Sequence, residues 1–141
     1  MFDSINLPAV LVSWLVAFFS GFVWFGPKTF FPIWWKLMGK ASSDVPGGGT
    51  NMGITFGSVL VGQLIAIVTL AIVINPLTEI GRVNSATDGA LVGLLLGLGI
   101  AAATALGHRM FSGHGALVWL IESGNDIINL GIAGAILAAW R

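Results

Sequence analysis

Hydrophobic residues fill four long segments of the chain, and short polar stretches separate them. The segments cover about residues 5–26, 52–74, 87–108 and 116–139. A helix needs about 20 apolar residues to cross the hydrocarbon core of a bilayer, so each segment is long enough to span it. Runs of this length are too long for barrel strands, whereas helices satisfy their own backbone hydrogen bonds in lipid. The pattern predicts an all-α fold, an integral membrane four-helix bundle that forms a single domain over residues 1–141.

The connection between the first two segments mixes aromatic residues with lysines. "PKTFFPIWWKLMGK" suits the headgroup layer, where an amphipathic helix over about residues 28–40 lies flat, anchored by Trp34, Trp35 and Lys36. A site for a substrate or a lipid headgroup is the alternative. The following "ASSDVPGGGTN" is typical of a flexible loop. Further along, Asn75-Pro76 is expected to end the second helix, because proline removes a backbone donor.

The third segment carries small residues at every fourth position. They are Gly89, Gly93, Gly97, Ala101 and Ala105. Small residues let membrane helices approach closely. This ridge therefore predicts helix packing, either on another helix of the same chain or on another subunit.

The fourth segment carries polar side chains along one narrow face. At about 100° per residue, Glu122, Asp126 and Asn129 share an arc, with Asn125 at its edge. A carboxylate that faces hydrocarbon costs several kcal/mol, so this polar stripe is expected to face protein, water or a partner.

His108 and Gln63 are the candidate partners of the polar stripe. His108 ends the third helix on the side where Glu122 lies, whereas Arg109 is expected to point away toward the interface. Gln63 stands alone on an aliphatic face of the second helix, at the depth of Asp126 and Asn129. Three explanations stay open: hydrogen bonds that hold helices together, a proton or ion pathway, and a contact to another subunit or a cofactor.

Composition and charge narrow the classes of function. The chain is 56% hydrophobic and 9% charged, with a net charge of zero, so it offers no basic patch for nucleic acid. It has no cysteine, and the spacing of His108, His114 and Glu122 matches no metal-ligand motif. No hydrolase elbow, phosphate loop or dinucleotide fingerprint occurs. The sequence therefore predicts neither an enzyme, nor a metal, nor a bound cofactor.

Lysine and arginine residues near the helix ends predict an orientation in the cell membrane. Lys28, Lys36, Lys40 and Arg109 lie on one side, and Arg82 and Arg141 lie on the other. This bias favours a cytoplasmic connection after the first helix and termini that are both non-cytoplasmic.

Several landmarks make the chain similar to a known family. "FGP" at the end of the first segment, "WWKLMG" and the closing "GAILAAWR" resemble the bacterial four-helix membrane family catalogued as domain of unknown function 1761. The resemblance implies a small multi-pass membrane protein with no established activity and supplies no catalytic residues. The leading hypothesis is that the chain moves a proton, ion or small solute along the polar stripe. The alternative is a non-catalytic accessory subunit of a larger membrane complex. The bundle is expected to be oligomeric: a pure homo-oligomer would favour the first hypothesis, and stable co-purifying proteins would favour the second.

Overall fold

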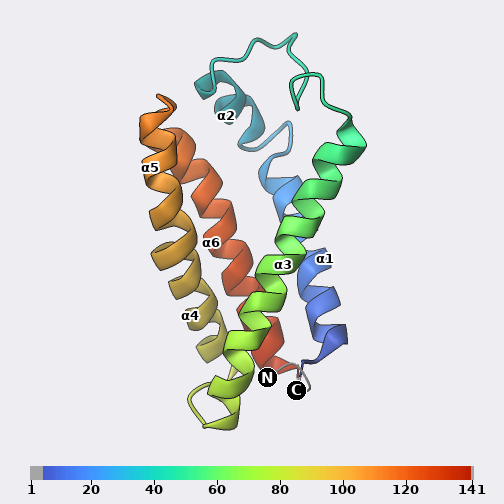
Figure 1. The fold of residues 1–141 in the computed structure, drawn as a ribbon, viewed down its shortest axis with the longest axis vertical. Helices are drawn as coiled ribbons and strands as arrows, with labels where there is room; N and C mark the ends of the chain where they lie inside the picture. Colours follow the sequence, from blue (N-terminus) through green and yellow to red (C-terminus); the bar gives the residue numbers. More distant parts are fainter. Residues whose placement is uncertain (1–4, 141) are drawn as a thin grey trace.

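The protein is all-helical over residues 5–140, the part of the chain that the computed structural model describes. The elements are α1 (Leu7–Trp24), α2 (Phe31–Leu37), α3 (Met52–Glu79), α4 (Ala86–Leu96), a π-helix (Gly97–Ala102), α5 (Ala103–Phe111) and α6 (Gly115–Ala139). The long helices lie roughly along one common axis (Figure 1). Residues 5 and 140 lie together at one end, the termini end, where the Asn6 side chain donates to the carbonyl of Trp140. The short α2 and the loop after it lie at the opposite end, the α2 end.

Three helices are long and apolar enough to cross a membrane. They are Leu7–Trp24, Met52–Glu79 and the continuous helix Ala86–Phe111, which comprises α4, the π-helix and α5. The fourth long helix, α6, has 25 residues but carries the polar stripe. The predicted all-α class is confirmed.

One predicted helix end is wrong, because α3 continues through Asn75 and Pro76 to Glu79. Pro76 lacks the N–H that would donate to the carbonyl of Ile72, so it removes one helical hydrogen bond without ending the helix. The carbonyl of Pro76 still accepts from the backbone N–H of Ile80, so the last turn closes normally. At the other predicted boundaries, Asn6 and Asn51 cap α1 and α3, and Ser85 forms a capping box with Asp88 at the start of α4.

The third predicted span is a continuous helix with a change of phase in its middle. Its fully buried positions are Gly89, Gly93, Gly97 and Ala102, so the last step is five residues where the earlier steps are four. The π-helix causes this shift, because it places an additional residue in one turn. Ala102 therefore takes the inward position that a uniform helix would give to Ala101, which is only half-buried.

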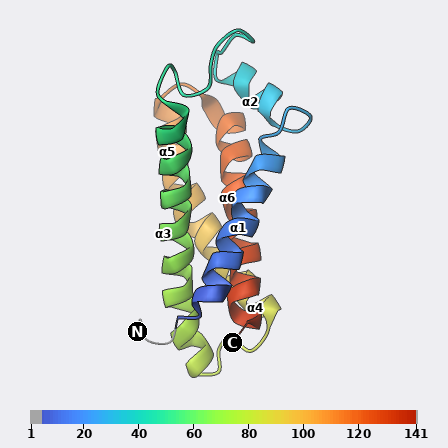
Figure 2. The same ribbon diagram turned by 90° about the vertical axis from the view of Figure 1, so that its right-hand side faces the viewer.

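The central helix of the molecule is α6, which contacts every other helix (Figures 1 and 2). It packs most closely on α4, where glycines bring the two backbones together. A Cβ atom on Gly93 would overlap with the carbonyl oxygen of Leu130, and one on Gly89 would overlap with the carbonyl oxygen of Gly134. At Gly97, a Cβ atom would lie 2.8 Å from the Cα of Ile127. The ridge thus packs within this chain over its first three positions.

The apolar core lies toward the termini end. Ala9 and Val10 of α1 meet Ile67, Leu70, Ala71 and Ile74 of α3 and Ala133, Leu137 and Ala138 of α6. The first half of α3, Met52–Ala66, contains no fully buried residue. In Figure 1 this half of α3 diverges from α6 toward the α2 end. The buried residues of α1 also end at Ala17, about two turns before the helix does, so the bundle is tight at the termini end and looser at the α2 end.

We expect Gly93→Ala to destabilise the protein, because the added methyl group must separate two backbones in contact. Overpacking of this kind costs about 1–3 kcal/mol. Gly107→Ala is the matched control, since a Cβ atom there meets nothing within 4 Å. Alanine in an open helical position is favoured over glycine by about 0.5–1 kcal/mol, so the control should unfold at the same temperature or higher. Thermal unfolding in detergent, followed by circular dichroism, measures both, and equal midpoints would contradict this packing.

Candidate functional site

The four residues of the polar stripe lie on one side of α6 but in different surroundings. Asn125 and Asn129 are buried, with exposed fractions of 9% and 7%. Glu122 is half-buried near the α2 end, and Asp126 is exposed one turn further along the helix. The polar stripe therefore has a half-buried carboxylate at Glu122, an exposed one at Asp126 and two buried amides at Asn125 and Asn129.

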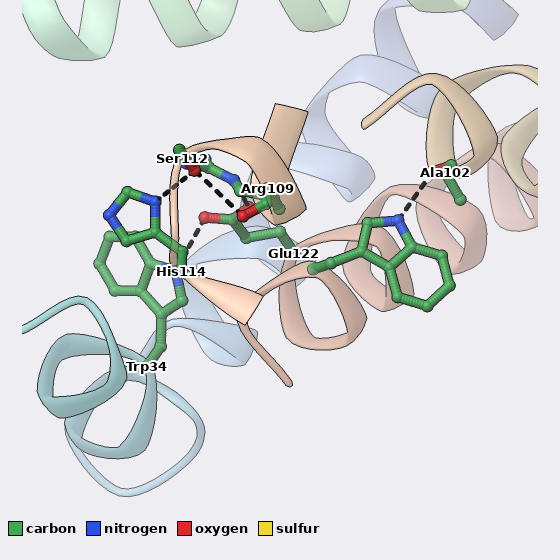
Figure 3. A network of polar contacts seen from close by, with 7 residues as sticks. Trp34, Ala102, Arg109, Ser112, His114 and Glu122 are labelled. Carbon is green, nitrogen blue, oxygen red and sulfur yellow. Dashed lines mark hydrogen bonds and ion pairs between the residues drawn. The ribbon is translucent and has the colours of Figure 1, made fainter. Parts of the chain in front are cut away.

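Glu122 joins three helices through its two carboxylate oxygens (Figure 3). The Nε of Arg109, on α5, lies 2.5 Å from Oε2, and the indole N–H of Trp34, on α2, donates to Oε1 over 2.9 Å. Hydrogen bonds to charged groups contribute about 1.5–3 kcal/mol each, less where water screens them. Trp34 was predicted only as an interfacial anchor; its partner on α6 lies 88 positions away in the sequence.

The cation that pairs with Glu122 is Arg109, and the prediction that Arg109 points away is wrong. His108, the predicted partner, is exposed and forms no hydrogen bond with Glu122 among the described residues. The π-helix explains the difference. Its additional residue rotates everything after Ala102 by about 100° relative to a uniform helix, so the position that faces α6 moves from 108 to 109. Trp119 of α6 also contacts the helix at this shift, because its indole N–H donates to the carbonyl of Ala102 over 2.7 Å (Figure 3).

The two asparagines pair with each other along α6. The Nδ2 of Asn129 lies 3.3 Å from the Oδ1 of Asn125, and Asn125 faces Gly21 of α1. Gln63, the other predicted partner, forms no hydrogen bond with Asp126 or Asn129 within residues 5–140. Its Oε1 is one of three buried side-chain oxygens without a hydrogen bond there, together with the Oγ of Ser13 and the Oδ1 of Asn129. Among the described residues, the structure therefore shows no hydrogen bond between Gln63 and the polar stripe.

Asp126 is left uncovered because α3 leaves α6 at this level. Ala133 and Leu137 lie seven and eleven residues after Asp126, on the same side of α6, and both are buried in the core against α3. Toward the α2 end, α3 diverges from α6 (Figure 1), and Asp126 is exposed. Asp126 forms no hydrogen bond or ion pair with any residue that the structure describes. An exposed, unpaired carboxylate thus occupies the middle of the central helix.

Metal binding finds no support in the described part of the chain, where no three His, Cys, Asp or Glu residues cluster. The ring of His114 lies 2.7 Å from the Oγ of Ser112, which in turn donates to the carbonyl of Arg109 (Figure 3). These contacts close the turn between α5 and α6. His114 therefore stabilises the turn that follows Arg109, the residue that pairs with Glu122.

Removal of the cation from this network should destabilise the protein. Arg109→Gln leaves a half-buried carboxylate beside Trp34, and we expect a loss of about 1–3 kcal/mol in the free energy of unfolding. His108→Gln, at the neighbouring exposed position, should change nothing. In the double variant Arg109→Gln/Glu122→Gln, the neutral amide at position 122 still accepts from Trp34. Part of the stability lost in Arg109→Gln should therefore be restored. A double-mutant cycle by thermal unfolding gives the coupling energy, and an equal cost for His108→Gln would exclude the assigned pairing.

Comparisons with known proteins place the chain in a family. No curated protein and no solved structure matches it. The family described as "Protein of unknown function (DUF1761)" matches over residues 8–138, which covers the four long helices except for the first residue of α1 and the last residue of α6. The resemblance noted in the sequence is thereby confirmed: the chain belongs to the DUF1761 family of proteins of unknown function.

Proposed function

We propose that this protein crosses the membrane four times and serves as a non-catalytic subunit of a membrane assembly. Three of its helices are long and apolar enough to cross a bilayer, and α6 runs among them from the α2 end to the termini end. A helix of 25 residues spans about 37 Å, which exceeds the hydrocarbon thickness of about 30 Å. As the central helix, α6 is the fourth span in this proposal.

The observation that carries the proposal is the exposure of Asp126. At mid-span, a carboxylate on the surface of a single chain costs at least about 2.5–3.5 kcal/mol. Another membrane chain that presents a hydrogen-bond donor or a cation to this position removes the cost. The open side of α6, between the diverging half of α3 and α5, is where such a chain would pack.

A second candidate function is the movement of a proton, ion or small solute, and the polar stripe favours it. Glu122, Asp126 and Asn129 line α6 from the α2 end to its middle. Beyond Asn129, the side of α6 that faces α3 is apolar, with Ala133 and Leu137 packed on Ile67 and Leu70. A single copy thus offers polar groups along only half of a route, and a complete route needs polar groups from another chain. We rank the assembly role first for this reason.

Native mass spectrometry after gentle extraction tests the assembly role. We expect a mass above the 14.7 kDa of one chain for the wild type. Asp126→Leu should lower that mass to one chain, because it removes the polar contact, while Ile128→Leu, an exposed position on a different side of α6, should not. A single 14.7 kDa chain in every sample would reject the proposal.

The same samples in proteoliposomes test the second candidate. If the polar stripe carries protons or cations, wild-type vesicles should show flux above empty vesicles. Asp126→Asn keeps the shape of the side chain and removes its charge, so it should abolish this flux. Wild-type vesicles that behave as empty ones would end the transport candidate and leave the assembly role standing.

The proposed orientation places the α2 end in the cytoplasm and both termini outside it. Lys28, Lys36, Lys40 and Arg109 lie at or near the α2 end and Arg82 near the termini end, while Arg141 is outside the described residues.

Single cysteines at Ser43 and Ala86 test this, because both positions are exposed and the chain contains no other thiol. In intact cells, an impermeant maleimide should label Ala86→Cys and spare Ser43→Cys. The reverse labelling would show the inverted orientation.

A further inference from the structure

A cavity of about 540 Å³ lies between α2 and the loop that follows it. The residues that matter for its chemistry are Phe31, Trp35, Lys36, Lys40, Ser42 and Asp44. Two aromatic side chains and two lysines therefore line one cavity at the α2 end, away from the polar stripe of α6.

The loop is held against α2 by specific hydrogen bonds. Gly39 has a φ of +72°, a conformation that favours glycine, and there the chain turns back over the helix. The indole N–H of Trp35 then donates to the carbonyl of Ala41 over 2.8 Å. The backbone N–H of Ala41 in turn donates to the Oδ2 of Asp44 over 2.8 Å. The cavity is thus formed before any ligand arrives.

One wall of the cavity is aromatic and fixed in place. The rings of Phe31 and Trp35 stack with centroids 5.3 Å apart and an interplanar angle of 20°. Trp34, the neighbour of Trp35, anchors α2 to α6 through its hydrogen bond with Glu122. This wall offers a flat apolar surface at the α2 end of the bundle.

The lysines that border this wall are available to a ligand. Lys36 and Lys40 are exposed, and neither ammonium group forms an ion pair or hydrogen bond with another described residue. The last carbonyls of α2 do not require them, because the backbone N–H groups of Met38, Gly39 and Lys40 already donate to these carbonyls. Asp44 is the one carboxylate in the lining, so the cavity keeps an excess of one positive charge.

We propose that this cavity binds the phosphate headgroup of an anionic phospholipid. Lysine binds phosphate as a point charge, and two unpaired lysines at one site attract a phosphate diester. The stacked Phe31 and Trp35 face the glycerol and the first acyl carbons, as aromatic residues do at membrane interfaces. A free phosphate ion would use the lysines but gain nothing from the aromatic wall. The combination therefore selects a lipid.

Lipid retention in native mass spectrometry tests the proposal. Protein in a neutral detergent is titrated with phosphatidylglycerol or phosphatidylcholine, and bound lipid is counted. Phosphatidylglycerol should bind on the order of tenfold more tightly, and Lys36→Gln/Lys40→Gln should remove most of this preference. Lys28→Gln, in the same connection but outside the cavity, should retain it. Asp44→Asn keeps an acceptor for Ala41 and removes the repelling charge, so it should tighten binding several-fold.

Two results would overturn the proposal. An equal loss for Lys28→Gln and for the double variant would show that the lysines attract anionic lipid diffusely, without a site. Displacement of phosphatidylglycerol by millimolar inorganic phosphate would show that the cavity takes a free anion and that the aromatic wall plays no part. Unchanged unfolding temperatures in all variants, measured on the same samples, ensure that a loss of lipid reflects the cavity and not the fold.

Discussion

The close contact between the backbones of α4 and α6 is the constraint on which the arrangement of the other helices depends. In a bilayer, helices gain no hydrophobic driving force by leaving lipid for one another, so van der Waals contact between close backbones is a main source of association. Gly89, Gly93 and Gly134 allow that contact. Because α4 packs so closely on one side of α6, the other sides of α6 can contact α1 and α3 and carry the polar stripe.

The helix spans were predictable because each depends on the length of an apolar run, and the small-residue ridge because it depends on a regular period. The partner of Glu122 was not predictable, because the four-residue period that begins at Gly89 is broken by the π-helix. Residues 101–103 are all alanine, so nothing in their chemistry shows which of them faces α6. The bond from Trp34 to Glu122 joins distant segments, and no local pattern signals it. Exposure of Asp126 depends on where α3 diverges, which is a property of tertiary packing.

Glu122 connects two regions that the sequence presents as separate. It is the first member of the polar stripe on α6, and it also anchors α2 through Trp34. Helix α2 has seven residues and no buried side chain of its own, so local propensity does little to hold it in place. The position of its aromatic surface thus depends in part on one carboxylate, which Arg109 also binds, together with the ring contact between Trp34 and Phe25 of the preceding turn.

The π-helix lets one continuous helix serve two contacts whose spacing does not fit a single pitch. The glycines before the π-helix pack against the backbone of α6, and Arg109 after it forms an ion pair with Glu122. Loss of one residue between Gly97 and Ala102 would restore an ordinary α-helical turn and leave both contacts in register. A gain or loss of one residue elsewhere between Gly89 and Arg109 would disrupt one of them. Loss of one residue is therefore tolerable at this turn of the helix in a way that it is not in the turns on either side.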